Sequence, residues 1–178
     1  MKRLLVIFAV ATMTLGASAQ VLEESKTFDN FYIGVNGGVS TKMTGQNGWL
    51  GGLNPNAGLR VGRWFTPVFG FAVEGNAYFS NKSNEPGFMP EKKTFVRYTN
   101  VGAIATVNIS NWFGGYLGEP RTCEFIAVAG LGWGHQFGTN DKMKLNNLNN
   151  TTAKAGFDLA FNLGASKAWQ IYVEPAVT

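Results

Sequence analysis

Apolar and polar residues alternate in seven stretches of this chain, and the connections between the stretches are alternately long and short. The stretch 155–164 shows the pattern best, because every second side chain in it is apolar: Ala155, Phe157, Leu159, Phe161 and Leu163. Side chains of a β-strand project to opposite faces with period two, so each stretch predicts a strand with one apolar and one polar face. We expect an all-β fold, an antiparallel up-and-down transmembrane barrel with its apolar side toward lipid.

The first residues have the pattern of an export signal. Lys2 and Arg3 precede the apolar run 4–15, which is too short to span a bilayer, and Ala17-Ser18-Ala19 provides small residues for cleavage before Gln20. The alternative interpretation is a short membrane anchor. We therefore divide the chain into a signal peptide, residues 1–19, and one barrel domain, residues 20–178.

Charge and composition exclude several functions. The 15 Lys and Arg include Lys2 and Arg3, so 13 remain against 11 Asp and Glu in the predicted mature chain, a net charge of +2. Such weak basicity argues against a nucleic-acid partner. Only 15% of residues are charged, against about 25% in ordinary soluble domains. The single Cys123 allows no intrachain disulfide, and we expect it to be a small buried hydrophobic residue.

The strand pattern and the turn residues predict the order of elements. We expect strands at about 30–40, 56–65, 68–80, 95–111, 122–138 and 155–164, and a seventh that begins at Trp169. The connections 41–55, 81–94 and 139–152 are long, whereas 66–67 and 166–168 are short. Outer-membrane barrels have long outer loops and short periplasmic turns, which favours a barrel over a soluble β-sandwich.

Aromatic residues cluster near the ends of the predicted strands. Near the short turns we expect one girdle formed by Phe31, Tyr32, Trp64, Phe65, Trp112, Phe113 and Trp169. Near the long loops we expect a second girdle formed by Tyr78, Phe79, Tyr98, Trp133 and Phe137. Aromatic rings prefer the headgroup level of a bilayer, so two such bands support a membrane barrel.

Charged residues in the middle of strands occupy the polar face. We expect a charge network inside the barrel formed by Arg60, Glu74, Glu124, Lys154, Asp158 and Glu174. The short turn at Pro67 brings Arg60 within cross-strand reach of Glu74, and Asp158 faces Glu174 across the 166–168 turn. Two carboxylates that close repel each other unless a cation intervenes, and Arg60, Lys154 or a side chain from an eighth strand could be that cation.

Two segments carry a family resemblance. One of them is the segment Asn111-Trp112-Phe113-Gly114-Gly115-Tyr116, which is followed by the run 125–137. This part of the sequence resembles the N-terminal barrel of OmpA-type outer-membrane proteins of Bacteroidetes-like bacteria. The opening 31–38 and the segment 60–65 are similar to it too. The resemblance covers residues 30–178 and implies eight strands in up-and-down order, with a C-terminal periplasmic domain that binds peptidoglycan.

The chain departs from this family pattern at its C-terminal side. We see no eighth strand and no peptidoglycan-binding segment, so we expect a barrel truncated before strand eight. An unclosed barrel leaves backbone groups without partners in lipid, which is costly. The resemblance also implies the Gram-negative outer membrane as the location, with outer-membrane lipid and the barrel-assembly machinery as partners.

Candidate catalytic residues are few. His135 is the only histidine, which excludes a multi-histidine metal site, and we expect it to point inward near the outer end of its strand. We therefore expect no enzyme activity and no cofactor. The main functional hypothesis is a structural barrel that displays loops and, in its full-length form, links the outer membrane to the cell wall. The alternatives are a weak small-solute porin with a gated lumen and a surface adhesin that binds through its loops.

Overall fold

The computed structural model describes residues 7–17, 30–42, 53–79, 96–137 and 148–178. Within these ranges the chain forms β1 (Ile7–Ala17), β2 (Phe31–Lys42), β3 (Asn54–Trp64), β4 (Phe69–Phe79), β5 (Val96–Asn108), α1 (Ile109–Gly114), β6 (Cys123–Gln136), β7 (Leu148–Leu163), β8 (Trp169–Val173) and β9 (Ala176–Val177). No helix in this part of the chain is long and apolar enough to cross a bilayer. The predicted long loops lie mostly outside the described residues.

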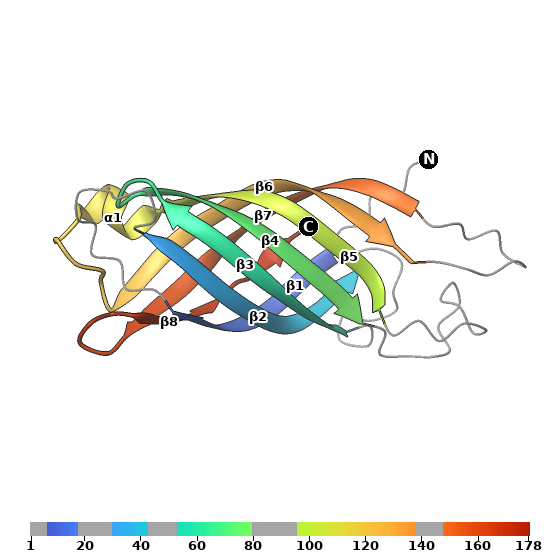
Figure 1. Cartoon of the computed structure of the whole chain (residues 1–178), viewed down its shortest axis with the longest axis horizontal. Helices are drawn as coiled ribbons and strands as arrows, with labels where there is room; N and C mark the ends of the chain where they lie inside the picture. The colour runs from blue at the N-terminus through green and yellow to red at the C-terminus, as the bar shows by residue number, and fades with distance from the viewer. Residues whose placement is uncertain (1–6, 18–29, 43–52, 80–95, 138–147) are drawn as a thin grey trace, which may run out of the picture.

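The strands form one curled antiparallel sheet. Each strand from β2 to β7 pairs with the next along the chain, and β1 pairs with both β8 and β2, which joins the two edges of the sheet. The strands run obliquely across the long axis (Figure 1). The turn 65–68, α1 and the turn 164–168 share one end of this barrel, which we call the turn end. The predicted all-β barrel fold is confirmed.

The strand β1 comes from the segment that the sequence predicts to be a leader. Leu15 pairs with Val35 of β2 and with Ile171 of β8, so β1 lies in the position that we expected to be open. The expectation of an open edge is thus wrong for the chain described here. The physical reason is that an extended segment between β2 and β8 can form hydrogen bonds with both. It thereby removes the cost of leaving the backbone groups of these two edge strands unpaired. Cleavage before Gln20 stays a prediction.

Disulfide cross-linking tests this position of β1. In a Cys123→Ser background, the pair Leu15→Cys and Val35→Cys is expected to form a disulfide in the refolded uncleaved chain, because opposed residues of antiparallel strands have Cα atoms about 4.5–5.5 Å apart. The control protein carries Leu15→Cys and Leu59→Cys. Leu59 lies on β3, where it pairs with Val35, so it is one strand further from β1 than Val35 is. The yield of each disulfide is measured by mass spectrometry of the oxidised proteins. Equal yields from the two pairs would contradict the position of β1.

Two predicted boundaries are wrong for identifiable reasons. The fourth predicted strand ends early, because Asn108 accepts a hydrogen bond from the backbone N–H of Asn111 at 3.0 Å and caps α1. The strand β7 begins at Leu148, inside the predicted loop 139–152. Its first four residues, three of which are polar, pair with β6, from Leu148 opposite Gln136 to Thr151 opposite Trp133. Backbone pairing therefore continues beyond the apolar alternation that we used to place the strand.

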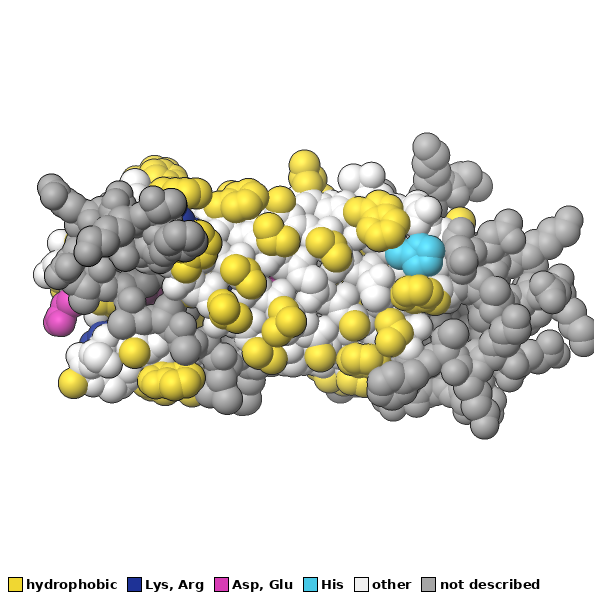
Figure 2. Space-filling model, in the orientation of Figure 1, with side chains coloured by type: hydrophobic (Ala, Val, Ile, Leu, Met, Phe, Trp, Pro, Cys, Tyr) yellow, Lys and Arg dark blue, Asp and Glu magenta, His cyan; other side chains and the backbone are white. Residues whose placement is uncertain are grey.

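The distribution of side chains is inside-out compared with that of a soluble domain. Among the described side chains, twenty-two large hydrophobic ones are exposed, whereas fourteen polar or charged ones are buried. On the face that Figure 2 shows, apolar side chains are spread over the described strands, and charged side chains are visible at the turn end. A small apolar cluster inside consists of Ala72, Ile104, Ile126, Val128, Ala160 and Tyr172. The predicted parity of the strand faces is therefore confirmed in the described strands.

Only some of the residues assigned to the predicted aromatic girdles face outward. Exposed outward aromatics include Phe31, Phe65, Trp112, Phe113, Trp133 and Trp169, while Phe79 and Phe137 are half-buried. The girdle assignment is wrong for Tyr32, Trp64, Tyr78 and Tyr98. Tyr32 and Trp64 pack against the interior cluster, Tyr78 is buried, and the Tyr98 ring lies 5.5 Å from the Tyr78 ring. All four have even numbers in strands whose even positions face inward, so parity decides their direction.

Candidate functional site

A cluster of ionised side chains occupies the interior of the barrel, and Arg60 is its centre. Arg60 is the largest fully buried side chain in the described residues. It lies on β3 directly opposite Glu74 of β4, at inward positions on both strands. The short turn 65–68 sets this register, because the Thr66 hydroxyl accepts hydrogen bonds from the backbone N–H groups of Val68 at 3.2 Å and Phe69 at 2.8 Å.

The guanidinium group of Arg60 contacts three carboxylates. Its Nε donates to Glu74 Oε2 at 2.6 Å, its Nη1 donates to Asp158 Oδ2 at 3.0 Å, and its Nη2 donates to Glu174 Oε2. The last two partners lie 98 and 114 residues away along the chain, so closure of the barrel brings them together. The guanidinium carbon also lies 5.1 Å from the centre of the Tyr172 ring. A planar, permanently charged group with five donors suits this position.

Lys154 is the second cation of the cluster. Its Nζ lies 2.6 Å from Glu74 Oε1 and 2.6 Å from Glu174 Oε1, so it bridges the carboxylates that Arg60 also contacts. Asn76 Nδ2 donates to Glu74 Oε1 at 2.6 Å. The structure thus brings five of the six predicted network residues together, and Arg60 is the cation that contacts both Asp158 and Glu174. The sequence left that choice open.

Glu124 is the predicted network member that the structure places elsewhere. It is buried, but its Oε2 accepts a hydrogen bond from Asn162 Nδ2 at 3.1 Å and its Oε1 accepts one from the backbone N–H of Arg121 at 3.3 Å. Glu124 lies at the start of β6, near the turn end, whereas the Arg60 cluster lies further along the barrel. An inward-facing position is thus not enough to place a residue in the charge network. The position of the residue along the barrel axis also decides which side chains it contacts.

The interior is tightly filled. A Cβ atom on Gly62 would lie 2.3 Å from Cζ of Tyr32, and one on Gly134 would lie 1.6 Å from the Tyr98 hydroxyl. These two glycines allow the tyrosine rings to lie inside the barrel. Glycine in a strand commonly marks such a close approach. The tyrosines that we assigned to the girdles are thus part of the filling of the lumen.

Two small cavities border the ion cluster. The larger, about 50 Å³, lies toward the turn end and is lined in part by Arg60 and Asp158. The smaller, about 10 Å³, is lined in part by Glu74 and Lys154. The two cavities share no lining residue, so the cluster separates them in the described part of the chain. An eight-stranded barrel has an interior that side chains just fill, which agrees with this arrangement.

The remaining reactive residues form no catalytic arrangement in the described ranges. His135 lies on the outer face and not, as expected, on the inner one, because it shares its parity with the exposed Trp133. Its ring stacks on Trp133 with centroids 5.7 Å apart, and its Nδ1 lies 2.7 Å from Asn149 Oδ1. Cys123 is exposed, so the expectation of a buried thiol is wrong. No group of three or more His, Cys, Asp or Glu residues suited to a metal ion occurs among the described residues.

Comparison of the chain with protein-family models, with curated proteins and with solved structures found no match. The buried ion cluster and the apolar outer face therefore carry the functional argument.

Proposed function

We propose that this protein is a structural outer-membrane β-barrel of the OmpA type that displays its connecting loops at the cell surface. The observation that carries the proposal is the inside-out distribution of side chains. Arg60, Glu74 and Glu174 are each 2% exposed inside the barrel, whereas outward residues such as Val73 and Leu131 are 49% and 68% exposed. A barrel in lipid requires this arrangement, because lipid chains cover apolar side chains and exclude charged ones.

The exposed aromatics support the same proposal. The ring of Trp112 lies 5.5 Å from that of Phe69 and 6.2 Å from that of Phe113, and all three are exposed at the turn end. Arg63 points outward there, with its guanidinium carbon 5.4 Å from the ring centre of Phe31. Aromatic rings with a nearby Arg side chain suit the headgroup region of a bilayer.

Cell fractionation and folding assays test the proposal. We expect the expressed protein in the outer-membrane fraction, and we expect the refolded chain to need detergent or lipid and to migrate differently in SDS gels before and after heating. Protease treatment of intact cells is expected to cut within the long connections predicted at 41–55, 81–94 and 139–152. Recovery of folded protein from the aqueous fraction without detergent would overturn the proposal.

A weak pore with a gated lumen is the second candidate, and the two cavities beside the ion cluster favour it. In the described chain the cluster separates these cavities, so conduction would require Arg60 and its partners to rearrange. Single-channel recording distinguishes the candidates, because discrete and reproducible conductance would reject a permanently filled lumen. The link to the cell wall that the family resemblance implies stays a prediction.

A further inference from the structure

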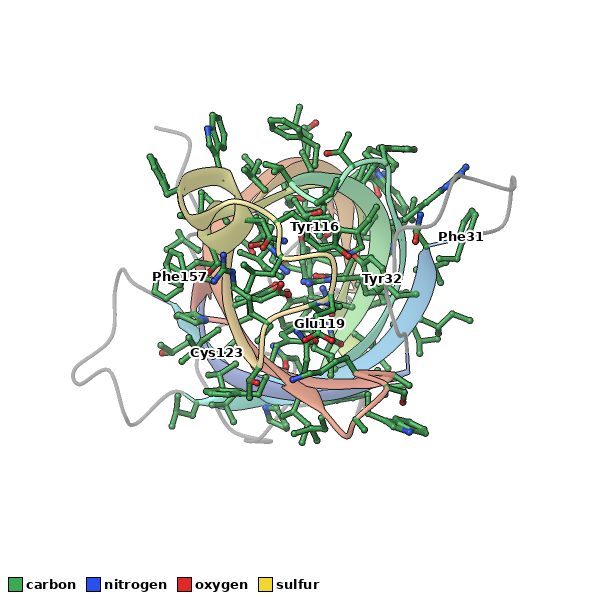
Figure 3. All side chains as sticks on the ribbon, turned by 90° about the vertical axis from the view of Figure 1, so that its left-hand side faces the viewer. Phe31, Tyr32, Tyr116, Glu119, Cys123 and Phe157 are labelled. Carbon is green, nitrogen blue, oxygen red and sulfur yellow. The ribbon has the colours of Figure 1, made fainter. Side chains whose placement is uncertain are left out.

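The larger cavity lies between the ion cluster and the segment 115–121, which crosses the opening at the turn end. Figure 3 looks into this end and shows Tyr116 and Glu119 over the opening, with Tyr32 pointing into the barrel. Tyr116 and Pro120 line the cavity on the side of this segment, and Arg60 and Asp158 line it on the side of the cluster. The cavity therefore has an ionised floor and a cover supplied by a connection between strands.

Four oxygen atoms of side chains that line this cavity have no hydrogen-bond partner in the described chain. They are Thr106 Oγ1, Asn111 Oδ1, the Tyr116 hydroxyl and Asp158 Oδ1. Thr106, Asn111 and Asp158 are 2%, 5% and 5% exposed, so bulk water does not compensate them. Buried polar groups are normally satisfied, and an unsatisfied one costs about 1–3 kcal/mol.

The amide orientation of Asn111 follows from its other contact. Its Nδ2 donates to the carbonyl oxygen of Pro67 at 2.9 Å, which leaves its Oδ1 as the unpartnered atom. Asp158 likewise uses Oδ2 for Arg60 and leaves Oδ1. Asn111 Oδ1 can act only as an acceptor, and so can Asp158 Oδ1 when this carboxyl group is ionised, so both atoms then need a donor or a cation.

The ionised side chains in the interior of the barrel also favour an additional cation. Glu74, Glu124, Asp158 and Glu174 are buried in the described barrel, and Arg60 and Lys154 are the cations that contact members of this set through side-chain ion pairs. Arg121 Nη2 donates to the carbonyl oxygens of Gly114 and Gly115, and no ion pair joins its guanidinium group to Glu124 in the described chain. Ion pairs thus compensate Glu74, Asp158 and Glu174 but not Glu124, and an uncompensated buried charge is costly.

We propose that this cavity binds a small monovalent cation of the sodium or potassium type, with Asp158 Oδ1 as the charged ligand. Oxygen donors suit hard cations. One carboxylate with neutral hydroxyl and amide oxygens matches a single positive charge better than a double one, because Glu74 and Glu174 already pair with Arg60 and Lys154. A volume of about 50 Å³ admits such an ion and a few water molecules.

The first test measures thermal unfolding of the full chain after it has been refolded in detergent. It compares sodium chloride and potassium chloride with N-methyl-D-glucamine chloride at the same ionic strength. The bulky cation cannot enter the cavity, so we expect a melting temperature about 3 °C or more higher in the alkali salts. Asp158→Asn keeps the shape of the side chain and is expected to abolish this difference. The matched control Glu119→Gln, an exposed carboxylate at the same end, should preserve it.

The competing occupant is a proton, because the carboxyl groups of Asp158 and Glu174 lie in hydrogen-bond contact. A melting temperature that is equal in all three salts, or a salt difference that survives Asp158→Asn, would overturn the proposal. A second, direct test is crystallisation of the unaltered protein in rubidium chloride. An anomalous-scattering peak in the cavity is expected, and a cavity that holds only water would overturn the cation site whatever the location of the protein in the cell.

Discussion

Arg60→Met is expected to destabilise the folded barrel by about 3–5 kcal/mol, the cost of breaking a buried ion pair by removing one partner. The substitution leaves Glu74, Asp158 and Glu174 in the interior with Lys154 as the cation that contacts two of them. Methionine fills part of the volume of arginine but donates no hydrogen bond. The loss therefore comes mainly from the uncompensated carboxylates.

Urea unfolding of the protein in lipid vesicles, followed by tryptophan fluorescence, measures this effect. The matched control is Arg63→Met, three residues further along β3 on the outward face. Arg63 contacts Phe31 and Phe65 through cation–π geometry at 5.4 and 5.9 Å, so its loss should cost about 0.5–1 kcal/mol. Equal effects of the two substitutions would contradict a structural role for the ion cluster.

Arg60→Lys separates charge from geometry. A lysine retains the positive charge but replaces the planar fork that reaches Glu74, Asp158 and Glu174. We expect Arg60→Lys to recover only part of the stability lost in Arg60→Met. An increase in single-channel conductance in either variant would favour the gated pore over the structural barrel, because the cluster separates the two interior cavities.

Val73→Arg is the second change with a large expected effect, a loss of about 2–4 kcal/mol in a bilayer. Val73 lies at the middle of β4, where it pairs with Val61 and Ala103, and its side chain is 49% exposed on the outward face. In a membrane barrel this position faces the centre of the hydrocarbon layer, where an arginine side chain cannot reach the headgroups easily. In a soluble barrel the same substitution would be nearly neutral.

The control for Val73→Arg is Leu163→Arg. Leu163 is also apolar, is 41% exposed and lies at the last position of β7, beside the turn 164–168. There the cost of an outward arginine falls to about 0–1 kcal/mol. Folding yield into vesicles and urea unfolding measure both variants. If Val73→Arg folded and unfolded like Leu163→Arg, the outer face of β4 would not be in contact with lipid.

The sequence by itself determined which side chains point inward and which point outward. Residues such as Val73 and Arg60 follow period two, and this period is a local property of an extended backbone. The same rule explains the errors, because Tyr32, Trp64, Tyr78 and Tyr98 were assigned to girdles by their distance from strand ends. Their even positions already predicted an inward direction.

Only the tertiary structure decided which of the inward charges meet. Glu74 lies one short turn away from Arg60 and could be paired with it from the sequence, whereas Asp158 and Glu174 reach Arg60 only because the sheet curls and closes. Glu124 has the same parity but lies at another height in the barrel, so it bonds to Asn162. The closing strand β1 was hidden too, because pairing of a sheet edge depends on backbone groups that every residue except proline has, and leaves little trace in the order of side chains.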